Sequence, residues 1–328
     1  MRSICFFNST PFWGGGEAWH LGAARAFAAR GHRVVVVGSP GSELVERARA
    51  AGMDTVAFPV TNRSWLNPLL LRRLRRFFEG RRVGTVVFNG PADLKSGGLA
   101  ARSAGVPRRV YRRGLAVPVR DHPVNRYLFT RVLTHVVANS EETRRNLFRE
   151  MGAVVPAERV AVVPNGIDLK AFDARAARPA EERGQGRKGR LRLGNVGRLA
   201  AQKNQRLLLD VARVLVDRGL DVHLLVAGAG ELEDELRAET RRRNLEGHVT
   251  FTGFERDVPG FLRTLDVFLL SSLWEGFGNV ILEAGAARLP TVALDLSSNP
   301  ETVVDGTTGF LVPPDDVQAF ADRVALLA

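Results

Sequence analysis

Short apolar runs alternate with amphipathic segments of helix length along this chain, and that rhythm limits the possible folds more than any other feature. In the first half, apolar runs predict strands at residues 4–7, 34–37, 56–60, 85–88, 110–112 and 136–138. Helical patterns lie between them, at residues 17–29, 43–50, 69–78 and 141–149. Such alternation predicts a parallel sheet with helices on both faces.

The second half repeats this alternation. Strands are predicted at residues 191–196, 222–227, 249–252, 267–270, 291–294 and 310–312, and helices at residues 205–216, 232–244, 280–287 and 317–327. Between the halves, residues 173–190 have little apolar content, and their glycine-rich part, 184–189, is typical of a flexible loop. We therefore predict an α/β fold of two doubly wound, Rossmann-like domains, residues 1–168 and 191–328, joined by a linker at 169–190. Ligands of such sheets bind at the carboxyl ends of the strands, so a cleft between two facing domains is the predicted site.

The charge of the chain is unevenly distributed between these halves. The 328 residues carry 47 Lys and Arg against 35 Asp and Glu, a net charge of +12. Residues 1–170 hold 27 basic and 12 acidic side chains, and residues 171–328 hold 20 and 23. A strongly basic half favours a polyanionic partner. We expect no nucleic acid in that role, because the chain lacks zinc-ligand spacing and an aromatic RNA-recognition signature.

The cysteine content and the hydropathy of the chain indicate the cellular compartment in which we expect it. The single cysteine, Cys5, cannot form an internal disulfide, so a reducing compartment is expected. The first residues lack the pattern of a signal peptide, and no apolar stretch reaches the ~18 residues that span a bilayer. We therefore expect a cytoplasmic protein, with peripheral attachment to the inner face of the membrane as a further expectation.

Glycines after two predicted strands mark possible phosphate sites. The first strand leads into Gly14, Gly15 and Gly16, followed by Glu17 and a helix. Glycines let a ligand approach the backbone, and a helix N-terminus offers N–H groups to an anion, although a plain turn has the same composition. The spacing matches neither a Walker A motif nor the dinucleotide fingerprint, which disfavours a dinucleotide oxidoreductase.

Two cations and two carboxylates stand at strand ends in the second half. Arg198 ends a predicted strand and Lys203 precedes a helix, so together they could hold a diphosphate without a metal, or simply be solvated. Glu275 follows another apolar strand, and Glu283 lies on the next helix. One carboxylate could bind ligand hydroxyls at the loop and the other about two helical turns away.

Together these segments resemble the retaining glycosyltransferases of the two-domain GT-B fold, of the family 4, or group 1, type. The matching motifs cover nearly the whole chain in the family's order: residues 14–17, 162–168, 197–203, 275–284 and 301–312. The resemblance implies transfer of a sugar from a nucleotide-diphosphate sugar to a lipid-linked or saccharide acceptor in envelope glycan or polysaccharide biosynthesis. A nucleotide-sugar epimerase of the same fold is the alternative, and a nucleic-acid-binding protein is less favoured.

The resemblance also implies roles for single residues. Arg198 and Lys203 would contact the diphosphate, Glu275 the sugar hydroxyls and Glu283 the ribose; the first three are the predicted catalytic residues. The predicted donor-binding residues are Gly15, Gly16, Gly197, Gly228, Phe277, Gly278, Asn279, Val280 and Glu283. No cofactor or metal is expected, since the chain contains no Asp-x-Asp. The retention that the resemblance implies also requires no dedicated protein base, because a leaving phosphate oxygen can accept the acceptor's proton.

The chain departs from the family pattern in two places. Family members often carry a His after a middle strand of the first domain, whereas residues 110–114 contain none. Arg113 could supply a hydrogen-bond donor there, and His122 follows; with Glu17 they are the candidate acceptor-side residues. The sequence also stops at Ala328, directly after the predicted helix 317–327, where the family continues through further helices, so we expect a truncated form.

A basic amphipathic helix is predicted at residues 65–78. Its apolar side chains fall on one arc and its arginines, at 72, 73, 75 and 76, on the other. It either packs as a core helix with a solvated arginine face or rests on anionic lipid near a lipid-linked acceptor. A second basic cluster, which could bind an anionic acceptor, consists of Arg108, Arg109, Arg112, Arg113, Arg120 and Arg126.

Overall fold

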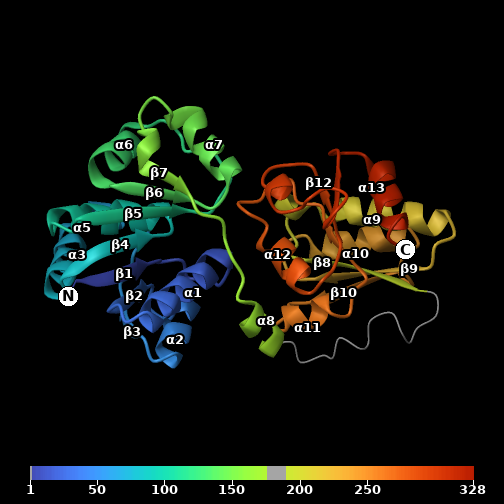
Figure 1. Ribbon diagram of the computed structural model, residues 1–328, viewed down its shortest axis with the longest axis horizontal. Helices are drawn as coiled ribbons and strands as arrows, with labels where there is room; N and C mark the ends of the chain where they lie inside the picture. Colours follow the sequence, from blue (N-terminus) through green and yellow to red (C-terminus); the bar gives the residue numbers. More distant parts are fainter. Residues whose placement is uncertain (1, 176–189) are drawn as a thin grey trace. The chain divides into compact units, whose positions relative to one another are not determined.

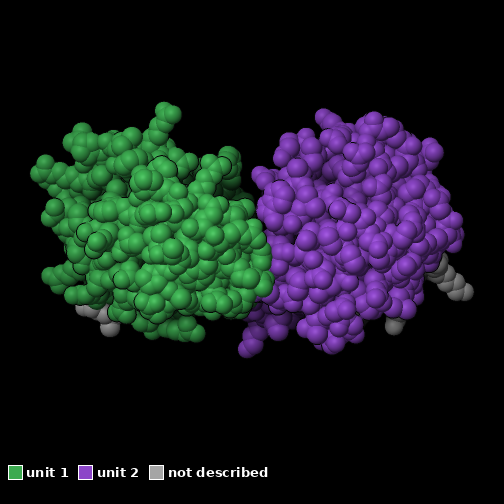
Figure 2. All heavy atoms as spheres, turned by 90° about the horizontal axis from the view of Figure 1, so that it is seen from above, with its two compact units in different colours: residues 1–165 green, residues 166–328 purple. Residues whose placement is uncertain are grey.

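The structure is a computed structural model that describes residues 2–175 and 190–328 (Figure 1). The chain forms two compact units, Met1–Asn165 and Gly166–Ala328, which are coloured separately in Figure 2. The glycine-rich residues 184–189 of the predicted linker lie outside the described residues.

Unit 1 contains a seven-stranded parallel sheet in the order β3-β2-β1-β4-β5-β6-β7. The strands are β1 Ser3–Phe7, β2 Val34–Gly38, β3 Asp54–Ala57, β4 Val83–Phe88, β5 Arg108–Arg113, β6 His135–Ala138 and β7 Val160–Val162. The chain order reverses between β1 and β4, so the carboxyl ends of these two strands border the crevice in which such sheets bind ligands.

Helices cover both faces of this sheet. They are α1 Gly15–Ala29, α2 Glu43–Ala50, α3 Pro68–Gly80, α4 Pro91–Asp93, α5 Leu99–Ser103, α6 Pro123–Tyr127 and α7 Glu141–Met151, with the 3₁₀-helices η1 Ser64–Leu66 and η4 Ala157–Arg159 and the π-helices η2 Leu94–Gly98 and η3 Leu128–Val132. Side chains of β1 alternate between the faces: Phe6 packs with Leu21 of α1, and Phe7 packs with Leu74 of α3. Burial on both faces explains why the strands are continuous apolar runs.

Unit 2 contains a six-stranded parallel sheet in the order β10-β9-β8-β11-β12-β13. The strands are β8 Leu191–Val196, β9 Val222–Ala227, β10 Val249–Gly253, β11 Val267–Leu270, β12 Thr291–Leu294 and β13 Gly309–Val312. The helices are α8 Leu169–Arg175, α9 Gln205–Asp217, α10 Glu233–Arg242, α11 Val258–Leu262, α12 Asn279–Ala286 and α13 Val317–Ala325, with the turns η6 Ala201–Lys203 and η7 Asn299–Glu301. Here the order reverses between β8 and β11, which makes their carboxyl ends the binding crevice.

These two doubly wound sheets confirm the predicted fold class. Residues Leu169–Arg175, expected in the linker, form α8, and Phe172 is buried in the core of unit 2. The strand predicted at residues 56–60 lies earlier, at Asp54–Ala57, because Pro59 has no N–H for a sheet hydrogen bond.

The π-helix η2 was not predicted from the sequence, because its two glycines are poor helix formers. At one of them, Gly97, a Cβ would lie 2.7 Å from the Phe88 ring, so glycine allows the close approach to β4.

Helix α3 packs as a core helix with a solvated arginine face, which is the first of the two alternatives predicted for the basic amphipathic segment. Leu70, Leu74 and Phe78 are buried against the sheet. Its four arginines, 72, 73, 75 and 76, are exposed. None of the helices among the described residues has the length and apolar character needed to cross a bilayer.

Candidate functional site

The turns after β8 and β9 pack directly against each other in unit 2. Gly228, which follows β9, has a φ of 146°, and a Cβ at this position would lie 1.8 Å from the carbonyl oxygen of Gly197. A side chain here is therefore excluded by both backbone conformation and space. The predicted glycines Gly197 and Gly228 are thus brought together at the crevice of unit 2.

An ion pair joins the turn after β8 to the loop after β11. Lys203 Nζ contacts Glu275 Oε1, and the two side chains are only 18% and 12% exposed. Gln202 Nε2 donates to the Trp274 carbonyl at 2.7 Å, and Ser271 Oγ donates to the Lys203 carbonyl at 2.8 Å. The lysine and the glutamate are therefore held in one place, each compensating the other's charge.

Two serines that sequence reasoning missed fix the Glu275 backbone. Ser297 Oγ donates to the Glu275 carbonyl at 2.8 Å and accepts from its N–H at 3.2 Å. Ser298 Oγ donates to the same carbonyl at 3.2 Å. Both serines follow β12, and their position after a predicted strand was the available signal. The carboxyl ends of β8, β11 and β12 thus converge on the Lys203–Glu275 pair.

Arg198 differs from Lys203 in its surroundings. Its side chain is exposed and forms no ion pair or hydrogen bond within residues 2–175 and 190–328. Its backbone is fixed, because Gln205 Nε2 donates to the Arg198 carbonyl at 3.0 Å. The site therefore offers one uncompensated cation and one cation already paired with a carboxylate.

Helix α12 carries the remaining predicted donor-binding residues. Gly278 caps its N-terminus with a φ of 69°, a left-handed conformation that suits glycine, and Asn279 and Val280 begin the helix. Phe277 is buried beside them. Glu283, one turn further, is half-buried, and its carboxylate accepts no hydrogen bond from any described residue. Burial raises the pKa of Glu283 to about 7, which nearby Arg175 partly opposes.

In unit 1 the end of the glycine-rich loop is held by buried polar contacts. Glu17 is 5% exposed and accepts from Asn8 Nδ2 at 2.9 Å and from Asn89 Nδ2 at 3.4 Å. A Cβ at Gly16 would lie 2.9 Å from Asn89 Nδ2, while Gly15 opens α1. The Glu17 carboxylate thus faces the protein interior, between the ends of β1 and β4.

The start of the same loop is held by Asp93, a second residue that sequence reasoning missed. This carboxylate is 1% exposed and accepts from the backbone N–H groups of Ser9 and Gly90, both at 2.8 Å, and from Ser9 Oγ. Burial raises the pKa of Asp93 to about 6. An aspartate just after β4 was the available signal. Buried carboxylates therefore anchor both ends of the loop.

The other two acceptor-side candidates have different environments. Arg113 is buried at the end of β5, donates to the Val117 carbonyl and is hydrogen-bonded to Tyr111; burial lowers the pKa of its guanidinium. His122 is exposed, and its Nδ1 accepts from the Val124 N–H at 3.2 Å, which caps α6. Of the two, only Arg113 lies at a strand's carboxyl end, as Glu17 does.

Sequence reasoning missed His20 and named Arg112 only as a member of the second basic cluster. His20 on α1 is fully buried; burial, followed by the charge of Arg112, lowers its pKa to about 3, so it is neutral at physiological pH. Arg112 is buried 4.9 Å from the centroid of the Trp19 ring and donates to Asn165 Oδ1 at 3.2 Å. Across the part of the chain that the structure describes, no three His, Cys, Asp or Glu side chains gather in a group suited to a metal ion.

Comparison with known proteins places both halves in one family of enzymes. The family model described as Glycosyltransferase Family 4 matches residues 13–171, and the model described as Glycosyl transferases group 1 matches residues 190–328. Protein EpsF of Bacillus subtilis (strain 168) is 34% identical over 261 residues, which cover 73% of this chain and 67% of that protein.

Two further comparisons extend over nearly the whole chain. The GDP-mannose-dependent alpha-(1-6)-phosphatidylinositol monomannoside mannosyltransferase of Mycobacterium tuberculosis (strain ATCC 25618 / H37Rv) is 30% identical, covering 99% of this chain and 89% of the relative. The crystal structure of Anabaena Alr3699/HepE in complex with UDP-glucose matches with a TM-score of 0.82 at 23% identity, covering 99% of this chain and 89% of that one. This structural match establishes the shared fold.

Proposed function

Because this chain belongs to the family 4, or group 1, glycosyltransferases of the GT-B fold, we propose that it transfers a sugar from a nucleotide-diphosphate sugar to a lipid-linked or saccharide acceptor with retention of anomeric configuration. The observation that carries this proposal is the placement of Arg198, Lys203 and Glu275 around one crevice of unit 2.

Arg198 and Lys203 would stabilise the departing diphosphate. Negative charge grows on the phosphate oxygens as the bond from the anomeric carbon breaks, so fixed cations bind the transition state more strongly than the ground state. Arg198 has its full charge available, and Lys203 is pre-positioned by Glu275. With two cations in place, we propose departure without a metal or other cofactor.

Glu275 would also orient the donor sugar. Its side chain is held by Lys203 and its backbone by two serines, so it offers carboxylate oxygens to sugar hydroxyls in a fixed geometry. The acceptor oxygen would form its new bond on the face from which the phosphate leaves. Its proton would pass to the leaving phosphate oxygen, which balances the step without a protein base.

The donor nucleotide would bind along α12, with Glu283 accepting from ribose hydroxyls. Its half-buried carboxylate has a strongly shifted pKa and no hydrogen-bond donor among the described residues, as is common for groups awaiting a ligand. The mycobacterial relative is named for GDP-mannose and the Anabaena structure holds UDP-glucose, so both nucleotides belong in the test.

The acceptor would be anionic or lipid-linked, and unit 1 would approach an anionic membrane surface. Residues 1–170 carry the excess of basic side chains, and the arginine face of α3 is exposed. The name of the mycobacterial relative specifies a phosphatidylinositol-linked acceptor, which is such a molecule. Basic surfaces attract anionic lipid at about 1 kcal/mol per side chain.

A nucleotide panel tests the proposal. Thermal unfolding is measured with UDP, GDP, ADP and their common sugar conjugates, and we expect one nucleotide to raise the melting temperature of the wild type. Glu283→Gln should weaken that shift, whereas the control Glu246→Gln, at an exposed position, should not. If no nucleotide stabilises the protein, the proposed donor class is wrong.

The stabilising nucleotide sugar is then used in a transfer assay. Incubation without acceptor separates transfer from epimerisation, because an epimerase converts the donor alone. NMR of the product reports the anomeric configuration, and an inverted product would refute retention. Added EDTA should leave the rate unchanged if no metal takes part.

A further inference from the structure

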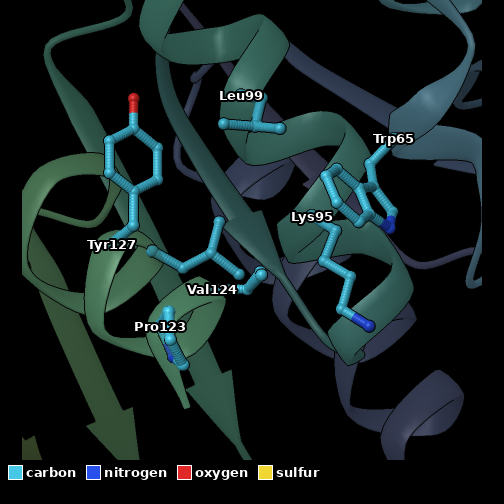
Figure 3. Close-up of a pocket in the computed structure, with 7 residues that line it drawn as sticks. Trp65, Lys95, Leu99, Pro123, Val124 and Tyr127 are labelled. Carbon is cyan, nitrogen blue, oxygen red and sulfur yellow. The ribbon is translucent and has the colours of Figure 1, made fainter.

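Unit 1 contains an apolar pocket of about 280 Å³ that none of the proposed steps uses (Figure 3). In Figure 3, Trp65 and Lys95 line one side of it and Tyr127 the other. It is lined by Trp65, Lys95, Leu99, Pro123, Val124, Tyr127 and Leu128.

The pocket is lined by connections that leave the carboxyl ends of three strands of unit 1. Its lining comes from η1, from η2 and α5, and from α6 and η3, which follow β3, β4 and β5 respectively. Trp65 and Val124 lie in the first helical elements after β3 and β5, and Lys95 lies in the second one after β4. Lys95 lies two residues after Asp93, whose carboxylate binds the Ser9 N–H and hydroxyl just beyond β1, so this side of the pocket borders the carboxyl edge of the sheet, where Arg113 ends β5.

The lining is suited to a hydrocarbon chain. Six of the seven lining residues carry apolar or aromatic side chains, and none is an acid. Trp65 and Tyr127 could also stack on a sugar. However, a buried saccharide would leave hydroxyls without hydrogen-bond partners here, and that costs free energy. An aliphatic chain has no such groups to satisfy.

The one charged lining residue is a cation. Lys95 is half-buried, and among the described residues its ammonium pairs with no carboxylate. Arg102 lies close by, donating to the Tyr127 hydroxyl at 2.9 Å. An apolar pocket with an uncompensated cation is complementary to a molecule that joins a hydrocarbon chain to an anion.

Exposed apolar side chains continue the surface next to the pocket. Leu66 and Leu69, which follow Trp65 on η1 and α3, are 64% and 73% exposed. Beyond them, α3 presents its arginines. Apolar groups beside cations are the composition of a surface that meets anionic lipid.

We propose that this pocket binds the first carbons of the hydrocarbon chain of a lipid-phosphate acceptor, with the phosphate at Lys95. This inference rests on the proposed function, since it names the acceptor's lipid class. The pocket would hold the acceptor by its lipid end at the edge of unit 1 that carries the acceptor-side candidates.

Binding of monododecyl phosphate below its micellar concentration tests the pocket, measured by isothermal titration on the full chain. We expect Lys95→Glu to weaken binding at least tenfold. Val124→Phe, which fills the pocket, should do the same without changing charge. The matched charge reversal Arg49→Glu, at an exposed position on α2, should leave the affinity unchanged. Inorganic phosphate should bind at least tenfold more weakly than the alkyl phosphate.

The nucleotide-induced rise in melting temperature provides the fold control and separates the two proposals. If Lys95→Glu and Val124→Phe keep the nucleotide shift but bind dodecyl phosphate as tightly as the wild type, the pocket assignment is wrong while the proposed function stands. If no nucleotide shift occurs in the wild type but both variants lose dodecyl phosphate while keeping the wild-type melting temperature, the pocket stands and the donor proposal fails. Equal weakening by Arg49→Glu would also overturn the assignment, because binding would then follow net charge alone.

Discussion

Replacing Glu283 by Gln should stabilise unit 2 at alkaline pH while weakening nucleotide binding. The carboxylate is half-buried on α12, and burial raises its pKa from 4.5 to about 7. The folded state therefore binds more protons than the unfolded state between these values. The free energy of unfolding must fall as pH rises through this window, and glutamine, which does not titrate, removes that fall.

The size of the effect follows from the shift. Each pKa unit corresponds to about 1.4 kcal/mol, so the full shift of Glu283 is worth about 3 kcal/mol. Partial solvent access lowers this figure, and we expect Glu283→Gln to gain about 2 kcal/mol at pH 8. At pH 5, where the folded wild type is largely protonated, most of the gain should vanish.

Amide hydrogen exchange measures this change in the stability of unit 2 separately from that of unit 1. Amide protection in β11 and β12 reports the opening of unit 2, and comparing both proteins at the same pH cancels the intrinsic exchange rates. Strand β4 in unit 1 is the internal control, and Glu246→Gln is the control variant. Equal protection of β11 and β12 in the two proteins at pH 8 would refute the reasoning, since burying the carboxylate would then cost nothing.

The same substitution should weaken nucleotide binding, although it stabilises the free protein. A hydrogen bond to a charged acceptor is worth about 1 kcal/mol more than one to a neutral acceptor. We therefore expect the nucleotide Kd to rise roughly fivefold. A residue that destabilises the free protein yet strengthens binding is typical of functional sites.

Three further predictions concern single contacts. Gly228→Ala should lower the free energy of unfolding by at least about 3 kcal/mol, because its Cβ would overlap the Gly197 carbonyl. The control Gly247→Ala, with open space around it, should be near neutral, and thermal melts compare the two variants. Arg198→Ala should lower kcat by about 100-fold or more with little change in melting temperature, because its side chain is exposed; an unchanged kcat would remove it from the phosphate site. Asp93→Ala should destabilise unit 1 by about 2–3 kcal/mol by leaving the Ser9 and Gly90 N–H groups unsatisfied, and unaltered exchange in β1 and β4 would contradict this.

Much of the fold was predictable because its main signal is local. A strand buried on both faces needs a continuous apolar run, and for this reason β8, β9, β11 and β12 lie where those runs predicted. Short elements with mixed signals, such as β7 and α11, were not predicted. Leu169–Arg175 was read as linker because a seven-residue helix with one buried aromatic, Phe172, has too little periodicity to stand out.

The site was predictable only as a set of residue types at strand ends. The sequence placed Arg198, Lys203 and Glu275 near strand ends and Glu283 on the helix that follows, and their roles stay predictions. It assigned Lys203 and Glu275 to separate parts of a ligand, and nothing in the sequence indicated that they pair with each other across 72 positions. That pairing depends on β8 and β11 being neighbours, which is a property of strand order.

The sequence by itself determined the fold class and the two-domain organisation, because apolar periodicity and glycine-marked strand ends follow from backbone geometry over a few residues. Only the tertiary structure decided which polar groups meet, namely the contacts by which Glu17 and Asp93 anchor the glycine-rich loop and the partner of Lys203. It also formed the apolar pocket beside Lys95. The physical reason is that crossover connections bring together segments far apart in the chain. Burial then sets the charge state of each group, as the raised pKa of Glu283 shows.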